Sequence, residues 1–303
     1  MPSSSDFKTR IAAAWHIWQT SPQRYSKLSA VVPPLIVDVE RAVRAAVAGN
    51  VSRERRDIYG CAADLYFLLR NFTKRIGRVA LSLLAADRAF RAAEVADDPL
   101  RLAAAEWNMA HVLLADGQPE GAEAVAMDAV SWLRPPLAND ANSMALCGSL
   151  LLVGSVAAVR YGDAWTARAR IDEAAKLAAR TGERNVLWTA FGPVNVAMHA
   201  VDIEQEAGEA AEGLHLAEQV DHHKAASIER RVAFRLEQAC CYRQRRDTAS
   251  VLLLLLQTER EAPEDVAHRP LARDLLRSVV RQGRRSVASE AAQLAGRVGV
   301  DIA

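Results

Sequence analysis

The 303-residue sequence has few of the residues that interrupt helices. It contains 15 glycines and 11 prolines, fewer than is usual for a globular chain of this length, and they gather at a few positions. Alternating β-branched runs, which are typical of half-buried strands, are nearly absent. Ala, Leu, Arg and Glu fill the intervals, and these residues are strong helix formers. The composition therefore predicts an all-α fold with long helices.

The chain also lacks an excess of charge of either sign. Lys and Arg number 38 and Asp and Glu 37, a formal net charge of +1, so the whole chain has no basic character that would indicate a polyanion such as DNA or an acidic membrane as a partner. Four cysteines in so long a chain do not make a disulfide framework. The first residues contain no apolar stretch of the signal-peptide type, and the leucine run 252–256 is too short to span a bilayer. We expect a cytoplasmic protein with no membrane segment.

Turn residues recur at intervals of one helix pair. They are Gly77, Gly117, Gly162, Gly208 and, more weakly, Arg246, at spacings of 38 to 46 residues. Five positions after each turn stands a residue that is mostly small: Ser82, Ala122, Ala167, Gly213 and Val251. A small residue is needed there if the second helix crosses close to the first. The pattern predicts tight helical hairpins, and the alternative is an irregular helical domain whose glycines fall at intervals by chance.

Prolines mark the ends of three of the predicted second helices. Pro99, Pro135 and Pro263 stand where a residue that cannot continue the hydrogen-bond ladder would stop them. A glycine between helices, an alanine five residues later and a proline near the end is the pattern of tetratricopeptide repeats, which residues 54–265 resemble in a stretched form. The resemblance implies a right-handed superhelix of about five to seven helix pairs, with residues 1–53 and 266–303 as capping helices.

Several segments carry a closer resemblance. They are WHIWQTSPQRYS (15–26), PPLIVDVE (33–40), ADLYFLL (63–69), EWNMAHVLLADG (106–117), WTAFGPVN (188–195), SIERR (227–231) and APED (262–265). These segments are similar to the C-terminal tetratricopeptide-like region of Xre-type helix-turn-helix transcriptional regulators of the actinomycete type. In that family a DNA-binding head precedes the equivalent of Phe7, and the sequence has no such recognition element. We expect either a trimmed regulator or a headless paralogue, with DNA contacted only through a helix-turn-helix that is not in this chain.

The resemblance places a ligand on the inner surface of the superhelix, which the first helix of each pair lines. Positions 2, 3, 6, 10 and 13 before each turn should face inward. Seven of these residues, before Gly77, Gly117 and Gly208, have side chains suited to a ligand and form the candidate binding set: Asn71, Lys74, Trp107, His111, Asn195, Met198 and Asp202. Asparagine amides can hold a peptide backbone, Lys74 can hold a carboxylate, and Trp107 and Met198 offer apolar surface. These features predict a peptide or a small amphipathic ligand. The alternative is that Trp107, His111 and Met198 are core residues and that the register is wrong by one or two positions.

The segment Phe191-Gly192-Pro193 has two interpretations. Gly-Pro can end one helix and begin the next, which would leave backbone N–H groups open to an anion near Asn195. It can equally be a stiff turn with Trp188 and Phe191 packed as hinge aromatics. The Trp15 and Trp18 pair lies three residues apart on one helical face, and we interpret it as structural.

No catalytic residue, metal site or cofactor is predicted. Adjacent His222 and His223 point about 100° apart on a helix and cannot hold a metal together as an i, i+4 pair can. Cys240 and Cys241 are interpreted as packed thiols. Phosphate-binding loops, G-x-S-x-G and His-Glu-x-x-His sequences are absent.

The resemblance and the candidate groove together give three hypotheses. The first is a ligand- or peptide-sensing and dimerisation module of a transcriptional regulator, which would act as a homodimer without membrane contact. The second is a stand-alone adaptor that docks a protein or precursor peptide. The third is a helical-repeat enzyme of unknown reaction, and we expect that the chain is not an enzyme.

Overall fold

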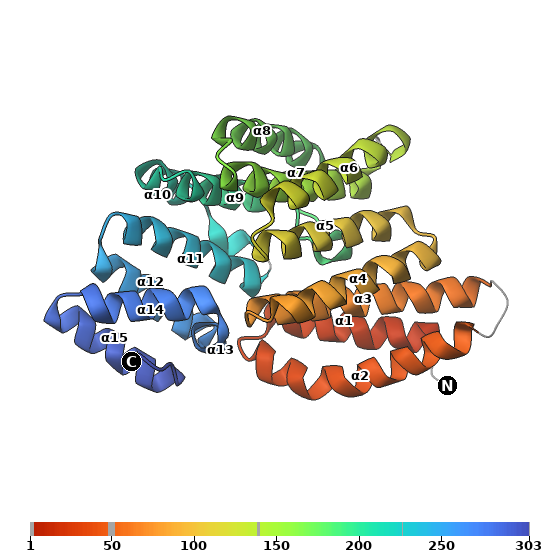
Figure 1. Cartoon of the computed structure of the whole chain (residues 1–303), viewed down its shortest axis with the longest axis horizontal. Helices are drawn as coiled ribbons and strands as arrows, with labels where there is room; N and C mark the ends of the chain where they lie inside the picture. Colours follow the sequence, from red (N-terminus) through yellow and green to blue (C-terminus); the bar gives the residue numbers. More distant parts are fainter. Residues whose placement is uncertain (1–2, 48–51, 138–139, 226, 303) are drawn as a thin grey trace.

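The structure, a computed structural model, describes residues 3–47, 52–137, 140–225 and 227–302. These residues form fifteen α-helices and two single-turn 3-10 helices (Figure 1). The β-type contact among them is one isolated antiparallel bridge between Arg184 and Phe191. The prediction of an all-α fold is confirmed.

The helices follow one another as antiparallel neighbours. The chain begins with α1 (Ser4–Thr20) and α2 (Arg24–Val47). Five pairs follow: α3 (Arg53–Arg75) with α4 (Val79–Ala96), α5 (Pro99–Ala115) with α6 (Pro119–Leu137), α7 (Ala141–Arg160) with α8 (Ala164–Thr181), α9 (Pro193–Glu206) with α10 (Ala210–Glu218), and α11 (Ile228–Gln244) with α12 (Thr248–Glu261). The chain ends with α13 (Pro263–His268), α14 (Pro270–Gln282) and α15 (Arg285–Val298), and the 3-10 helices are η1 (Val186–Trp188) and η2 (His222–Lys224).

Every predicted turn residue lies between the two helices of a pair. The four glycines have φ between 75° and 100°, and Arg246 has φ of 60°. Each turn has the same two backbone hydrogen bonds; in the third, Gly162 N–H donates to Val159 O at 3.1 Å and Asp163 N–H donates to Ala158 O at 2.9 Å. This is the Schellman arrangement, which needs a left-handed residue at the helix end. The five predicted turns are confirmed.

The small residues after the turns lie where the two helices of a pair approach each other. Ser82, Ala122 and Ala167 are fully buried, and a Cβ on Gly213 would lie 3.5 Å from Val201 O of the paired helix α9. Val251, the larger exception, is buried as well. The predicted need for small side chains at these positions agrees with this packing.

The prolines act at helix boundaries. Pro99 and Pro263 each occupy the first turn of a helix, after α4 and α12 have ended, where a missing N–H costs nothing. Pro135 lies in the last turn of α6, which ends at Leu137. The predicted boundary at 53/54 falls at the start of α3, whereas the boundary at 265/266 falls inside α13.

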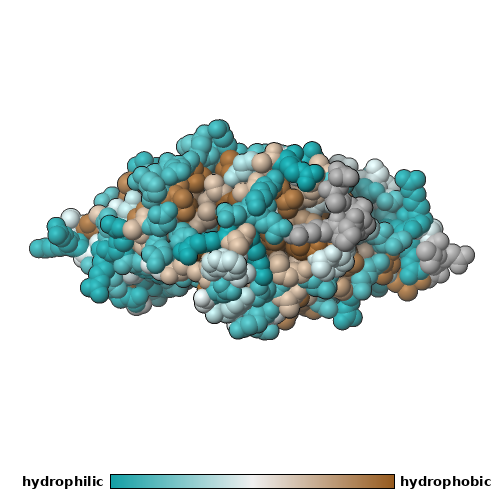
Figure 2. Space-filling view, turned by 90° about the horizontal axis from the view of Figure 1, so that it is seen from above, coloured by the Kyte–Doolittle hydropathy of each residue, from teal (hydrophilic) through white to brown (hydrophobic). Residues whose placement is uncertain are grey.

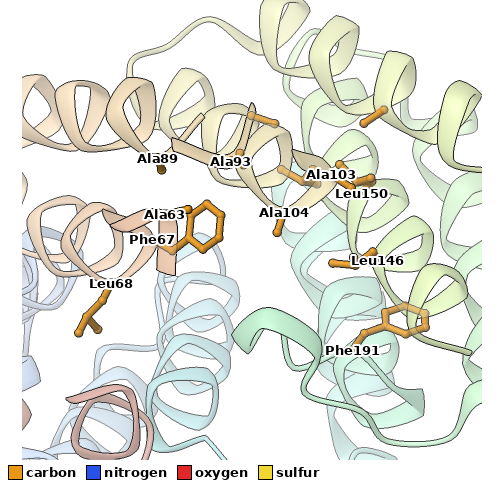
Figure 3. Close-up of a cluster of buried hydrophobic side chains, with 14 of the residues drawn as sticks. Ala63, Phe67, Leu68, Ala89, Ala93, Ala103, Ala104, Leu146, Leu150 and Phe191 are labelled. Atoms are coloured by element: carbon orange, nitrogen blue, oxygen red, sulfur yellow. The ribbon is translucent and has the colours of Figure 1, made fainter. Parts of the chain in front are cut away.

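Two large hydrophobic clusters form the core. One extends from Phe7 in α1 to Ile203 in α9, and the other extends from Ile228 in α11 to Val300 beyond α15. In the first cluster, alanines of successive helices pack closely while the rings of Phe67 and Phe191 fill wider spaces (Figure 3). Hydrophilic side chains cover much of the face seen in Figure 2, with apolar residues scattered among them.

Helix α7 is the most apolar element of the described chain. It is long and apolar enough to cross a membrane, but 94% of its apolar window is buried inside the protein, where it packs against α5, α6, α8 and α9. Its composition is that of a central core helix.

The first helical hairpin meets α13, near the C-terminal end of the array. The helices follow an arc, and α13 returns beside the start of α2 (Figure 1). Arg24 Nη2 lies 2.5 Å from Asp265 Oδ1, and both side chains are fully buried. Tyr25 N–H donates to Glu264 at 2.8 Å, and Arg269 Nε lies 2.5 Å from Asp265. We call these five residues the clasp. It closes the array into a ring around a central space.

Candidate functional site

The first helices of the pairs face the centre of the ring. Side chains from α1, α3, α5, α7, α9 and α11 surround a central cavity of about 70 Å³, and a wider groove of about 540 Å³ continues from it. The cavity and the groove share five lining residues: Lys74, Arg75, His111, His199 and Arg230. The volume of the groove, unlike that of the cavity, lies within the range of small-molecule sites.

Six of the seven predicted binding residues lie on this surface. Those on the cavity wall are Asn71, Lys74, Trp107, His111 and Asn195. Asp202 lines the groove together with Lys74 and His111. The structure thus brings together residues from α3, α5 and α9, and their binding of a ligand remains a prediction.

The predicted place of Met198 on the groove wall is wrong. Its side chain is fully buried and packs in a separate small cluster with Val201, Ala225 and Phe234. On α9 the inward positions are Asn195, His199, Asp202 and Glu206, and the neighbour of an inward residue is turned about 100° away from it. Sequence reasoning missed His199, which stands one position further along the helix.

Arg70 is the least compensated charge of the cavity. Its side chain is 1% exposed, and its Nε donates to Asn108 Oδ1 at 2.6 Å. Its Nη2 has no hydrogen-bond partner, and among the described residues no carboxylate forms an ion pair with it. Burial lowers the pKa of Arg70 to about 9. The clue in the sequence was a single arginine directly after the apolar stretch at residues 65–69.

Lys74 and His111 lie together between the cavity and the groove. Lys74 Nζ is 3.4 Å from His111 Nδ1. Burial lowers the pKa of both groups, and the nearby Arg75 and Arg70 lower the pKa of Lys74 further. Two basic groups that are held so closely favour the loss of a proton.

The remaining cations of the wall have carboxylate partners. Glu229 pairs with Arg75 and, at 3.3 Å, with Arg269, while Arg230 pairs with Glu237 at 3.2 Å. Burial alone would raise the pKa of Glu229, but Arg75 and Arg269 lower it well below its ordinary value. These pairs join α3, α11 and the clasp.

Aromatic rings cover much of the cavity wall. Four of the six tryptophans line it: Trp15, Trp18, Trp107 and Trp188. Trp15 stacks on Trp188, with ring centroids 4.6 Å apart and planes within 2°. The Arg70 guanidinium lies 5.1 Å from the Trp107 ring centroid, a cation–π distance. Trp15 and Trp18, which were interpreted as structural, are buried in the core and also form part of this wall.

The segment before α9 closes one side of the cavity. Leu187, Trp188 and Ala190 have φ of 45°, 62° and 52°, a conformation that costs free energy for residues other than glycine. The Trp15 stack and a 2.8 Å hydrogen bond from Asn185 Nδ2 to Gln19 Oε1 hold the segment in place.

The predicted anion position at the start of α9 is filled by the chain itself. Pro193 begins the helix, as expected, but Val194 N–H donates to Glu183 Oε1 at 2.8 Å. The ring of Phe191 is fully buried and lies against Gly148. This arrangement agrees with the stiff turn, and the Glu183 carboxylate takes the position at Val194 N–H that an external anion would take.

The other chemistry considered in the sequence has no site. Within the described residues, no group of three or more His, Cys, Asp or Glu residues could hold a metal ion. All four cysteines are buried, and burial raises the pKa of Cys240 to about 11 and that of Cys241 to about 12. Such thiols are poor nucleophiles.

No family model matches the sequence, and no curated protein matches it.

Proposed function

We propose that the chain is a tetratricopeptide-like, ligand-sensing and dimerisation module of a cytoplasmic transcriptional regulator. Five helix pairs with the same Schellman turn support the repeat interpretation. The first helix of every pair faces the centre of the ring, and this supports the assignment of the central cavity and groove as the binding surface. The segments that resemble Xre-type regulators support the regulatory role.

One observation carries the proposal. The cavity contains buried polar atoms without partners, Arg70 Nη2 and Asn195 Oδ1, and both residues are more than nine-tenths buried. An unpaired buried polar group costs about 1 to 3 kcal/mol, and a charged one costs more. A ligand that supplies the partners would recover this free energy.

A thermal-shift measurement tests the proposal. The small-molecule and peptide fraction of a cell extract should raise the melting temperature of the chain, because a ligand that binds only the native state stabilises it. Replacing Asn71, Trp107 and Asn195 with alanine should abolish the shift, whereas alanine at Arg91, which is exposed on α4, should leave it intact. A shift that survives the triple replacement contradicts the assignment of the site.

The groove of about 540 Å³ favours a second candidate, an adaptor that docks a peptide segment. Mass spectrometry of the stabilising fraction distinguishes a small molecule from a peptide.

The dimer is a separate part of the proposal, and light scattering that finds only a 33.0 kDa species at high concentration would contradict it.

A further inference from the structure

Two cations of the cavity wall, Lys74 and Arg70, form no ion pair with a carboxylate among the described residues. Arg75 is paired with Glu229 and Arg230 with Glu237. Lys74 lies against His111 rather than a carboxylate, but it reaches the wider groove. Arg70 is fully enclosed, and its direct contacts are the neutral Asn108 and the ring of Trp107, while Glu229 acts on it only electrostatically, without a hydrogen bond or ion pair. Of the two cations without a carboxylate, Arg70 is the enclosed one, so a negative charge is missing beside it.

The size of the cavity and the shape of the Arg70 guanidinium limit which anion can bind there. The cavity of about 70 Å³ has space for roughly five to seven water-sized groups, since one water needs about 10 to 15 Å³ on this measure, and the wider groove continues from it. A guanidinium matches a planar carboxylate in geometry. A dianionic phosphate would bring more charge than the guanidinium of Arg70 neutralises. The geometry favours a carboxylate.

Flat apolar surface lies next to Arg70. Trp107 stacks under the guanidinium, and Trp188 stacks on Trp15. Trp107 and Trp188 are only partly buried and line the cavity, so part of each side chain remains accessible. The amide of Asn195 lies on the same wall with an unpaired oxygen, which can accept a hydrogen bond from an N–H or O–H of a ligand but not from a carboxylate.

From these observations we propose that the central cavity binds a carboxylate that carries a flat apolar group, with the carboxylate at Arg70 and the flat group against Trp107 and Trp188. The inference rests on the proposed sensing function and adds the chemistry of the ligand. Two sources share this chemistry: a small aromatic acid and the C-terminal residue of a peptide whose preceding residues lie in the groove.

Calorimetric titration with matched acids and amides tests the proposal. The probes are 3-phenylpropionate with 3-phenylpropionamide, and the peptide Gly-Gly-Gly-Phe with its C-terminally amidated form. Each acid should bind at least about tenfold more tightly than its amide, because only the acid supplies a charge to Arg70. If the free peptide binds more tightly than phenylpropionate, the peptide is the source; the reverse order indicates the small acid. Equal binding of acid and amide, or no binding of either acid, overturns the proposal.

Substitution of Arg70 separates a binding role from a structural one. Arg70→Met should weaken binding of the acids at least about tenfold with only a small change in melting temperature, since the lost hydrogen bond to Asn108 is offset by removal of a buried charge without an ion-pair partner. The control Arg91→Met removes an exposed arginine and should change neither quantity. Unchanged acid binding by Arg70→Met contradicts the proposal.

If Arg70→Met does not fold, Arg70 has a structural role, and Arg70→Lys becomes the test. The proposal stands if Arg70→Lys folds, binds the acids more weakly than the wild type does, and still binds them more tightly than it binds the amides. It fails otherwise. If an extract fraction stabilises the wild type but not Asn195→Ala, and still stabilises Arg70→Met, the sensing function stands and the carboxylate inference fails.

Discussion

Asp202, on the groove wall, has a raised pKa. Its carboxyl is half-buried in that wall, and the neighbouring carboxylates of Glu237 and Glu206 add repulsion. Both effects raise its pKa, burial more strongly. The folded protein therefore retains a proton at Asp202 at pH values where the unfolded chain has lost it. Stability should fall as the pH rises above the ordinary value for aspartate, about 4, through the folded pKa.

Asp202→Asn should remove this pH dependence. At pH 8 the variant should be more stable than the wild type by on the order of 1 kcal/mol, and the difference should shrink towards pH 4, since the asparagine cannot ionise. Urea unfolding of both proteins at several pH values measures it. Asp172→Asn, on the exposed surface of α8, is the control and should show no trend. A difference that stays constant across this range would contradict the raised pKa.

Gly148 and Phe191 form a contact that permits no larger side chain. A Cβ on Gly148 would overlap the Phe191 ring, so Gly148→Ala should destabilise the protein by about 1 to 3 kcal/mol through overpacking. Gly296 in α15 has open space around the same position, and Gly296→Ala should instead stabilise by up to about 1 kcal/mol. Chemical denaturation of the two variants measures both signs. Equal effects would show that helix propensity, and not the ring contact, decides the outcome.

At the scale of elements, the turn was the most predictable feature. A Schellman turn is made by six consecutive residues and needs a left-handed residue at one of them, so a glycine at regular intervals carries most of the information. Even Arg246, the exception to glycine, could be placed because the spacing indicated it. Met198 could not be placed, because a shift of one residue on α9 depends on how the helix is rotated against α7 and α11, which local sequence does not determine.

The turn at Arg246 predicts a stabilising substitution. Its φ of 60° is strained for a residue with a Cβ, so Arg246→Gly should stabilise the protein by about 1 kcal/mol. Gly162 has φ of 100°, and no atom lies within 4 Å of the place that a Cβ would take there, so Gly162→Ala tests the backbone strain alone and should destabilise by a similar amount. Thermal unfolding gives both values. A destabilised Arg246→Gly would mean that the arginine side chain outweighs the backbone strain.

At the scale of the whole molecule, the clasp could not be predicted from the sequence. Arg24 and Asp265 lie 241 residues apart, and neither belongs to a local pattern that demands the other. The balance of charges in the cavity was hidden for the same reason, because Glu229, Arg75 and Arg269 come from three separate elements. The individual helices and the inner surface could be predicted, whereas the closure of the ring could not.

Asp265→Asn should break the clasp. The substitution leaves Arg24 and Arg269 buried without their shared carboxylate, and removing one partner of a buried ion pair costs about 3 to 5 kcal/mol. Asp57→Asn, which removes the partly exposed partner of Lys8, is the control and should cost less than about 1 kcal/mol. Denaturant unfolding measures both. A small effect for Asp265→Asn would show that apolar packing alone holds the two ends together.

Ring closure also determines how the molecule opens. In a linear array of helix pairs each pair contacts only its neighbours, so the terminal pairs unravel first and hydrogen exchange is fastest at the ends. Here α2 and α13 hold each other, so the N-terminal hairpin is not free to unravel first, and only α14 and α15 lie beyond the clasp. We expect the amides of α1, α2 and α13 to exchange together with those of α7 in one cooperative transition, and a nick in the chain between α9 and α11 to leave two halves that remain associated through the clasp.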